Sequence, residues 1–249
     1  MYFHDVHILI YVAIAVIGFV VGKFVNWMNY QFLQEKKIFS KEIFHKKIDY
    51  KPNLVLSLIT MIMYIVLLYI YGIGKTFLNN LPLIKYLILT PMILSAFIID
   101  YKEQIIPNRL NLTIFETGLI FLFVAGIFNV NIAINMFLGM IAGGGAFLLI
   151  TLIGGMIAGK EAMGFGDVKL MAGLGLYFGL TNIVLITLVS FLLGAVISII
   201  LLITKVRKTS EYIPFGPFIV MACFIIMIVP FNIILSLLAT IFSLGLMHI

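Results

Sequence analysis

Two aspartates stand in a sequence that otherwise avoids charge. Asp100 ends the apolar stretch PMILSAFIID, and Asp167 follows two glycines in EAMGFGDVKL. A charged side chain at membrane depth costs about 2.5–3.5 kcal/mol on insertion scales, so such residues are candidates for a functional site. Two carboxylates that lie close together cannot both ionise cheaply, and they therefore share one proton. The charged member can activate a water molecule while the protonated member polarises a carbonyl, which is the chemistry of an aspartic protease.

The residues around each aspartate leave a structural role open as well. Asp100 would lie at the C-terminal end of a helix, where the helix dipole disfavours negative charge, so a purely structural acid is not expected there. Gly164 and Gly166 permit unusual backbone angles and close backbone approach, which suits a site where an extended peptide lies beside a carboxylate. The alternative is that both glycines belong to a loop and that Asp167 caps the following helix. The pattern GFGD alone does not distinguish a functional site from a structural loop, because short glycine patterns are common in transmembrane helices.

The composition places these acids in a membrane protein. Of the 249 residues, 63% are hydrophobic and 10% are charged, whereas soluble domains usually carry about a quarter charged residues. Several apolar runs reach the roughly 17–25 residues that cross a bilayer. The first run, 7–28, is too long for the h-region of a cleaved signal peptide. The single cysteine, Cys223, excludes a disulfide within the chain and a cysteine-based zinc site.

We therefore expect an all-α, polytopic membrane helix bundle that forms one domain over residues 1–249. It should have about eight transmembrane helices, one of them short. The expected spans are 7–28, 54–71, 83–99, 112–128, 133–157, 170–180, 182–204 and 213–246, with Pro230 as a candidate break in the last. Most basic residues fall between spans, including a basic loop at about 29–53, so the net charge of +6 is read as a topological signal rather than a nucleic-acid site. By the positive-inside rule, Asp100 and Asp167 then lie on the same, cytoplasmic side.

Four segments in this order resemble a known family, the type IV prepilin peptidases, which are aspartic membrane proteases with a GxGD signature. The segments are GFVVGKFVNWMNYQ (18–31), IDYKEQIIPNRLNL (99–112), EAMGFGDVKLMAGLG (161–175) and IPFGPFIV (213–220). The resemblance implies an endopeptidase of the cell membrane that removes the leader peptide of prepilins or pseudopilins at the cytoplasmic face. Asp100 and Asp167 match the family's catalytic pair.

The resemblance also implies further site residues and partners. Residues that would bind substrate or shape the site are Gly164, Gly166, Lys169, Glu161, Pro107, Asn108 and Asn26. Pro107 and Asn108 are expected as turn residues before the fourth span. Lys169 either steadies a carboxylate or marks the cytoplasmic boundary. The expected partners are a prepilin or pseudopilin and the lipid bilayer, with no nucleic acid.

The chain departs from the family pattern in two places. Many members carry a cytoplasmic loop with two CxxC pairs that bind zinc, and they N-methylate the new N-terminus with S-adenosylmethionine. Loop 29–53 has no cysteine, so zinc is excluded there; methylation stays open, and S-adenosylmethionine is a cofactor only if that activity is retained. No metal and no cofactor are expected for proteolysis. Lys23 and Gln31 replace the family's Ser and Arg, and Lys23 either snorkels or pairs with an acid; a structural or network role is preferred for Glu116.

Three alternatives remain on the sequence alone. A proton-coupled transporter could use Asp100 and Asp167 as a relay, but such proteins often show internal repeats or broken central helices, and no repeat is evident. A presenilin-like intramembrane protease shares the glycine–aspartate signature, yet its first motif has tyrosine before aspartate, whereas this chain has IDY followed by IPN. A non-enzymatic assembly subunit could simply hold charged helix ends. Loss of cleavage in Asp100→Asn and Asp167→Asn would separate a protease from all three.

Overall fold

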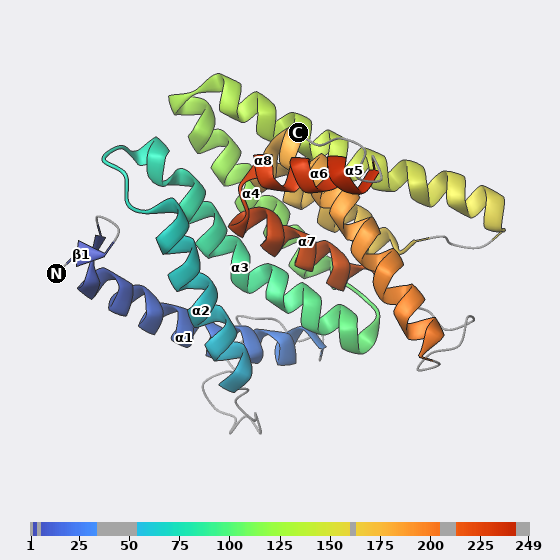
Figure 1. Ribbon diagram of the computed structural model, residues 1–249, viewed down its shortest axis with the longest axis horizontal. Coiled ribbons are helices and arrows are strands. Elements are labelled where there is room, and N and C mark those ends of the chain that lie inside the picture. The colour runs from blue at the N-terminus through green and yellow to red at the C-terminus, as the bar shows by residue number, and fades with distance from the viewer. Residues whose placement is uncertain (1, 4–5, 34–53, 160–162, 205–212, 243–249) are drawn as a thin grey trace.

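The computed structural model describes residues 2–3, 6–33, 54–159, 163–204 and 213–242, and it confirms the predicted all-α bundle (Figure 1). Its helices are α1 (Ile8–Leu33), α2 (Leu54–Tyr71), α3 (Phe77–Glu103), α4 (Asn108–Phe128), α5 (Val130–Ala158), α6 (Phe165–Ile203), α7 (Gly216–Ile228) and α8 (Phe231–Phe242). Before α1, the two-residue strands β1 (Tyr2–Phe3) and β2 (Val6–His7) pair antiparallel, a detail that the apolar pattern did not predict.

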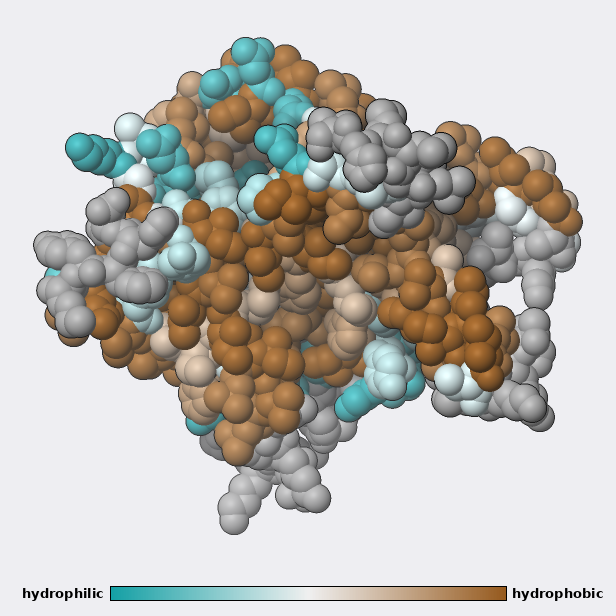
Figure 2. All heavy atoms as spheres, in the orientation of Figure 1, coloured by the Kyte–Doolittle hydropathy of each residue, from teal (hydrophilic) through white to brown (hydrophobic). Residues whose placement is uncertain are grey.

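The outer surface of the bundle is apolar. Six of the described helices, α1 to α6, are long and apolar enough to cross a bilayer. Large side chains point outward from them; Phe123 and Ile157, for example, are 68% and 83% exposed. Apolar residues cover most of the face shown in Figure 2. Soluble monomers rarely expose contiguous apolar patches above a few hundred Å², so this is a multi-pass membrane protein.

Helix α6 folds back on itself at Gly179. This glycine has φ 74° and ψ 177°, a conformation that other residues rarely adopt. Met171 and Ile183 lie beside each other, because a methyl group added at Gly143 would come within 2.6 Å of the Met171 carbonyl oxygen and 2.8 Å of Ile183 Cγ1. In a continuous helix Met171 and Ile183 would be about 18 Å apart along the axis.

The fold-back divides α6 into a first arm, residues 165–178, and a second arm, residues 180–203. These arms correspond to the predicted short span at 170–180 and the long span at 182–204. Asp167 lies in the first turn of the first arm, so the helices that precede α6 decide on which side of the bundle it lies.

Glycines hold the first arm of α6 against α5. A methyl group added at Gly139 or at Gly175 would clash with the backbone of the other glycine, so the two backbones are in direct contact there. In a membrane, helix association depends on such close packing because lipid tails are as apolar as the side chains. The arm that carries Asp167 in its first turn is thus fixed on a long neighbouring helix.

Three predicted boundaries were wrong. Helix α3 begins at Phe77 rather than at residue 83, because Thr76 caps it by accepting a hydrogen bond from the Asn79 N–H. Helix α4 begins at Asn108 rather than at residue 112, so Asn108 is the first helical residue and not part of a turn. Helix α1 continues to Leu33, into the expected loop at 29–53, whose remaining residues lie outside the described part of the chain.

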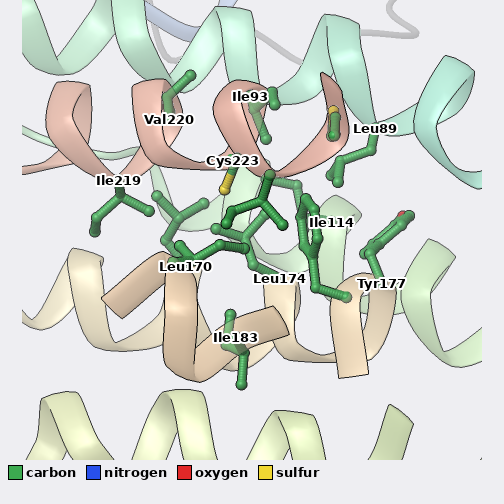
Figure 3. Close-up of a cluster of buried hydrophobic side chains, with 14 of the residues drawn as sticks. Leu89, Ile93, Ile114, Leu170, Leu174, Tyr177, Ile183, Ile219, Val220 and Cys223 are labelled. Atoms are coloured by element: carbon green, nitrogen blue, oxygen red, sulfur yellow. The ribbon is translucent and has the colours of Figure 1, made fainter. Parts of the chain in front are cut away.

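The core lies where α3, α4, α7 and the first arm of α6 meet. Figure 3 shows apolar side chains from these helices converging: Leu89, Ile93, Ile114, Leu170, Leu174, Tyr177, Ile219, Val220 and Cys223. Cys223 is fully buried among them. The last predicted span is divided into α7 and α8 at Pro230, as the sequence suggested. The helices that carry the two aspartates, α3 and α6, therefore share one packed interior.

Candidate active site

Both aspartates lie at the same end of the bundle and open on one cavity. Asp100 is in the last turn of α3 and Asp167 in the first turn of α6, and each is only 4% exposed. The cavity has a volume of about 580 Å³, and both carboxylates are among its lining groups. They are close enough for the charge on Asp100 to act on Asp167. The structure thus brings together the two residues on which the sequence analysis depended.

Asp100 is held by the start of α7. The backbone N–H of Gly216 donates a hydrogen bond of 2.9 Å to Oδ2 of Asp100. Gly216 is the first residue of α7, so the carboxylate lies at the N-terminal, positive end of that helix. Asp167 likewise lies in the first turn of α6. Two helix N-termini therefore point at the pair, and both stabilise negative charge there.

Neither signature glycine uses an unusual backbone conformation. Gly164 precedes α6 with φ −65° and ψ 136°, and the glycines with positive φ in the described chain are Gly72, Gly159 and Gly179. Gly166 is instead closely packed on a neighbouring residue, since a methyl group added there would lie 3.3 Å from Ile106 Cβ. The expectation about backbone angles was wrong. The close contact of Gly166 is with the Ile106 side chain, and the expected approach of a peptide backbone stays a prediction.

An asparagine fixes the turn that precedes Asp167. Asn111 on α4 is 3% exposed, and its Nδ2 donates a hydrogen bond of 3.0 Å to the carbonyl oxygen of Gly166. The bond joins α4 to the first turn of α6, one residue before Asp167. Asn111 directly precedes the predicted span at 112–128, and nothing in the sequence indicated that it would bind the Gly166 carbonyl.

Lys169 pairs with Asn108. The Lys169 Nζ donates a hydrogen bond of 2.7 Å to Oδ1 of Asn108, and it lies 5.5 Å from the centre of the Phe165 ring. Both Lys169 and Asn108 line the cavity that holds the aspartates. They also line an adjoining, almost wholly apolar cavity of about 360 Å³ between α4 and α6, with Phe115 and Ala172 in its wall. Lys169 therefore contacts an amide rather than steadying a carboxylate.

The other expected site residues stand apart from the cavity. Asn26 is half-buried on α1, and Pro107 precedes α4 between two cavity residues without lining the cavity itself. Lys23 is exposed and lies 4.9 Å from the ring centre of Phe19. Glu116 is exposed on α4. Glu161 lies outside the described residues.

Among the described residues, no group of three or more His, Cys, Asp or Glu side chains is placed to hold a metal ion. The acidic part of the cavity consists of Asp100 and Asp167, with Gln104 and Asn108 as uncharged polar neighbours. This set of groups is suited to proton transfer on a bound water and carbonyl.

Two further residues were missed by the sequence analysis. Gly216 lies in the segment IPFGPFIV, which carried part of the resemblance, but nothing in that pattern indicates which carboxylate its N–H would bind. Lys85 is a buried lysine on α3 whose Nζ donates a hydrogen bond of 2.8 Å to the carbonyl oxygen of Tyr177. A lone basic residue inside an apolar run was the available signal for Lys85.

The fold and the site together define a multi-pass helical membrane protein with a pair of buried carboxylates in one cavity. Residues 87–199, a little under half of the chain, match the sequence model of the type IV leader peptidase family. The matched segment contains both aspartates. No solved structure matches the chain.

Several curated proteins are similar to this chain. A prepilin leader peptidase/N-methyltransferase of Aeromonas hydrophila is 32% identical over 136 residues, which are 55% of this chain and 46% of that protein. Proteins of the same name from Xanthomonas campestris pv. campestris and Pseudomonas aeruginosa are 34% and 33% identical over 141 and 137 residues. These matches cover 54% and 55% of this chain and 48% and 46% of those proteins. The chain thus spans about half the length of the curated relatives that it matches.

Proposed function

We propose that this protein is an aspartic endopeptidase of the cell membrane that removes the leader peptide of type IV prepilins or pseudopilins. The observation that carries the proposal is that Asp100 and Asp167, from two different helices, are both buried and both open on one cavity. The relatives named prepilin leader peptidase support the substrate class. The basic residues between the spans support a cytoplasmic position for the cavity.

The two carboxylates can divide the chemistry between them. Asp100 accepts the Gly216 N–H, which stabilises its negative charge, so we assign it the role of general base. As Asp100 takes a proton from water, the water oxygen bonds to the scissile carbonyl carbon, and protonated Asp167 gives its proton to the carbonyl oxygen. When the C–N bond breaks, the leaving nitrogen takes the proton from Asp100. At the same time Asp167 recovers its proton from one hydroxyl of the tetrahedral intermediate, which leaves the product carboxylic acid and returns the pair to its starting state.

The cavity suits an extended peptide. Its walls combine apolar groups, such as Ile106 and Met163, with the polar side chains of Gln104 and Asn108. Apolar walls exclude bulk water and strengthen the electrostatic interactions inside, while the polar groups can bind peptide N–H and carbonyl groups. Burial of both acids keeps the shared proton within the pair.

N-methylation of the new N-terminus stays a separate question. The relatives are named as N-methyltransferases as well as peptidases, but the cysteine-free loop at 29–53 departs from the family pattern. Peptide hydrolysis by two carboxylates requires no cofactor. S-adenosylmethionine would serve this chain only if it keeps the second activity.

The test is cleavage of a purified prepilin by the protein in lipid nanodiscs. Asp100→Asn and Asp167→Asn should each lower kcat by at least about 100-fold, because each removes one half of the proton transfer. Glu116→Gln is the matched control, since Glu116 is an exposed acid on α4 outside the cavity; it should cleave normally. Cleavage should also persist in the presence of a metal chelator. Full cleavage by either aspartate variant would refute the proposed mechanism.

A further inference from the structure

Helix α3, which carries Asp100 near its end, also carries a buried lysine far from both aspartates. Lys85 on α3 is 8% exposed, and its Nζ donates a hydrogen bond of 2.8 Å to the carbonyl oxygen of Tyr177. The ammonium also lies 5.9 Å from the centre of the Tyr86 ring. A buried charge inside an apolar bundle is costly unless a partner compensates it. Lys85 therefore has a defined partner, and that partner is a backbone group of α6.

The Tyr177 carbonyl is accessible to Lys85 because α6 folds back two residues later. The conformation of Gly179 interrupts the regular hydrogen-bond pattern and makes Tyr177 part of the C-terminal end of the first arm. Carbonyl groups at such an end carry partial negative charge, which a cation stabilises. On the other side of the break, the Leu180 N–H donates a hydrogen bond of 3.1 Å to Oδ1 of Asn135 on α5. Both sides of the break are thus held by side chains from other helices, as backbone at membrane depth requires.

The Lys85–Tyr177 bond joins the two helices that carry the aspartates. At 1.5 Å per residue, Lys85 lies about 22 Å from Asp100 along α3, and Tyr177 lies about 15 Å from Asp167 along the first arm. Elsewhere α3 packs mainly on α7, α1 and α2, whereas α6 packs mainly on α5, α4 and α7. Beside the bond, the rings of Tyr86 on α3 and Phe178 on α6 also pack together, with their centres 5.3 Å apart. The bond is therefore the polar part of a direct connection between two helices that pack mainly on other helices.

We infer that Lys85 is a positioning residue for the carboxylate pair. Its bond to Tyr177 fixes the first arm of α6 along its axis relative to α3, and the rigid arm carries that position to Asp167 at its other end. Without the bond, the first arm can shift or tilt, and the separation of Asp100 and Asp167 changes with it. The catalytic consequence rests on the proposed function, whereas the effect on helix position does not.

The experiment compares Lys85→Met, Lys85→Arg and a control, Lys75→Met. Methionine keeps the length of the side chain and removes the donor, and arginine keeps the charge and the donor. Lys75 is an exposed lysine in the connection before α3. Each protein is studied in nanodiscs in two ways: kcat and KM for prepilin cleavage, and a spin-label distance between α3 and the first arm.

The spin labels are attached to cysteines introduced at Tyr101 and Phe165, which are 66% and 56% exposed at the site end of each helix. The native Cys223 is fully buried and stays in place, with an unsubstituted protein as the labelling control. Kinetics are measured on the unlabelled proteins, because Phe165 lines the cavity.

Lys85→Met should shift or broaden the distance distribution and lower kcat by about 10- to 100-fold, with KM changed by less than about threefold, as expected for misplaced catalytic groups. Lys85→Arg should restore most of both properties, and Lys75→Met should match the unsubstituted protein. A wild-type distance distribution in folded Lys85→Met would overturn the inference, whatever its activity.

If Lys85→Met does not fold, Lys85→Gln carries the test. Its side chain is uncharged and shorter than that of lysine, so the Tyr177 carbonyl loses the bond from the Lys85 ammonium. The same displacement is expected, and its absence would again overturn the inference. Failure of the peptidase assignment would be seen separately, as cleavage by Asp100→Asn or Asp167→Asn, because the distance measurement does not depend on proteolysis.

Discussion

The backbone N–H of Gly216 binds the carboxylate of Asp100 at 2.9 Å, and so joins the first turn of α7 to the last turn of α3. This contact explains how an acid is accommodated at the C-terminal end of its own helix. The carboxylate faces the positive end of a different helix, where negative charge is stabilised. The packing of α7 on α3 is therefore part of the site.

Gly216→Ala should inactivate the protein without unfolding it. The added methyl group would lie 2.5 Å from Oδ2 of Asp100 and 3.2 Å from Ile106 Cδ1, so the carboxylate must move. A displacement of about 1 Å can cost about 100-fold in rate, and we expect a loss of kcat of that order. Gly145→Ala is the control, because a methyl group there meets nothing within 4 Å. Steady-state cleavage rates check the prediction, and equal rates for the two variants would contradict it.

Gly175→Ala should destabilise the protein. The new methyl group would press on the backbone of Gly139 and lie 2.5 Å from the Met140 nitrogen, which forces α5 and the first arm of α6 apart. Overpacking of this kind costs about 1–3 kcal/mol. Thermal unfolding in detergent should show a lower Tm than for Gly126→Ala, whose methyl group would make an ordinary contact of 3.5 Å. An unchanged Tm would show that the helices can separate without cost.

Asn111→Leu should lower activity moderately. It keeps a similar volume and removes the hydrogen bond to the Gly166 carbonyl, which fixes the turn before Asp167. A hydrogen bond of this kind contributes about 0.5–1.5 kcal/mol, so kcat/KM should fall by about 3- to 10-fold. Asn232→Leu, at an exposed position on α8, serves as the comparison and should be neutral. Equal activity of the two variants would mean that the turn is held without Asn111.

Activity should follow a bell-shaped dependence on pH. The active form of the pair holds one proton, with Asp100 charged and Asp167 protonated. As the pH falls, a second proton binds and the general base is lost; as the pH rises, the shared proton leaves and the carbonyl is no longer polarised. Measurement of kcat/KM across the acidic-to-neutral range and above checks this. A flat profile would be inconsistent with a shared proton.

The sequence was sufficient to predict the arrangement of the aspartates. The apolar runs gave the order of crossings, and the basic segments placed Asp100 and Asp167 on one side. Two separate spans, at 170–180 and 182–204, were also predicted, and they correspond to the two arms of α6. These features depend on local composition, which a single sequence contains.

The contacts that hold the site could not be predicted in the same way. The bonds from Gly216 to Asp100 and from Lys85 to Tyr177 join residues far apart in the sequence, and each uses a backbone group that any residue type supplies. Their existence depends on how the helices pack. The start of α3 at Phe77 was missed for a related reason, since its polar first turn resembles a loop in composition.

The match to the peptidase family ends at residue 199, within the second arm of α6, whereas Gly216 lies beyond it. The segment that matches the family model therefore contains both acids but lacks the amide that binds one of them. We expect that segment alone to be inactive. Transferred alone into another membrane protein, this segment would supply both acids, but Asp100 would lack the hydrogen bond from the Gly216 N–H.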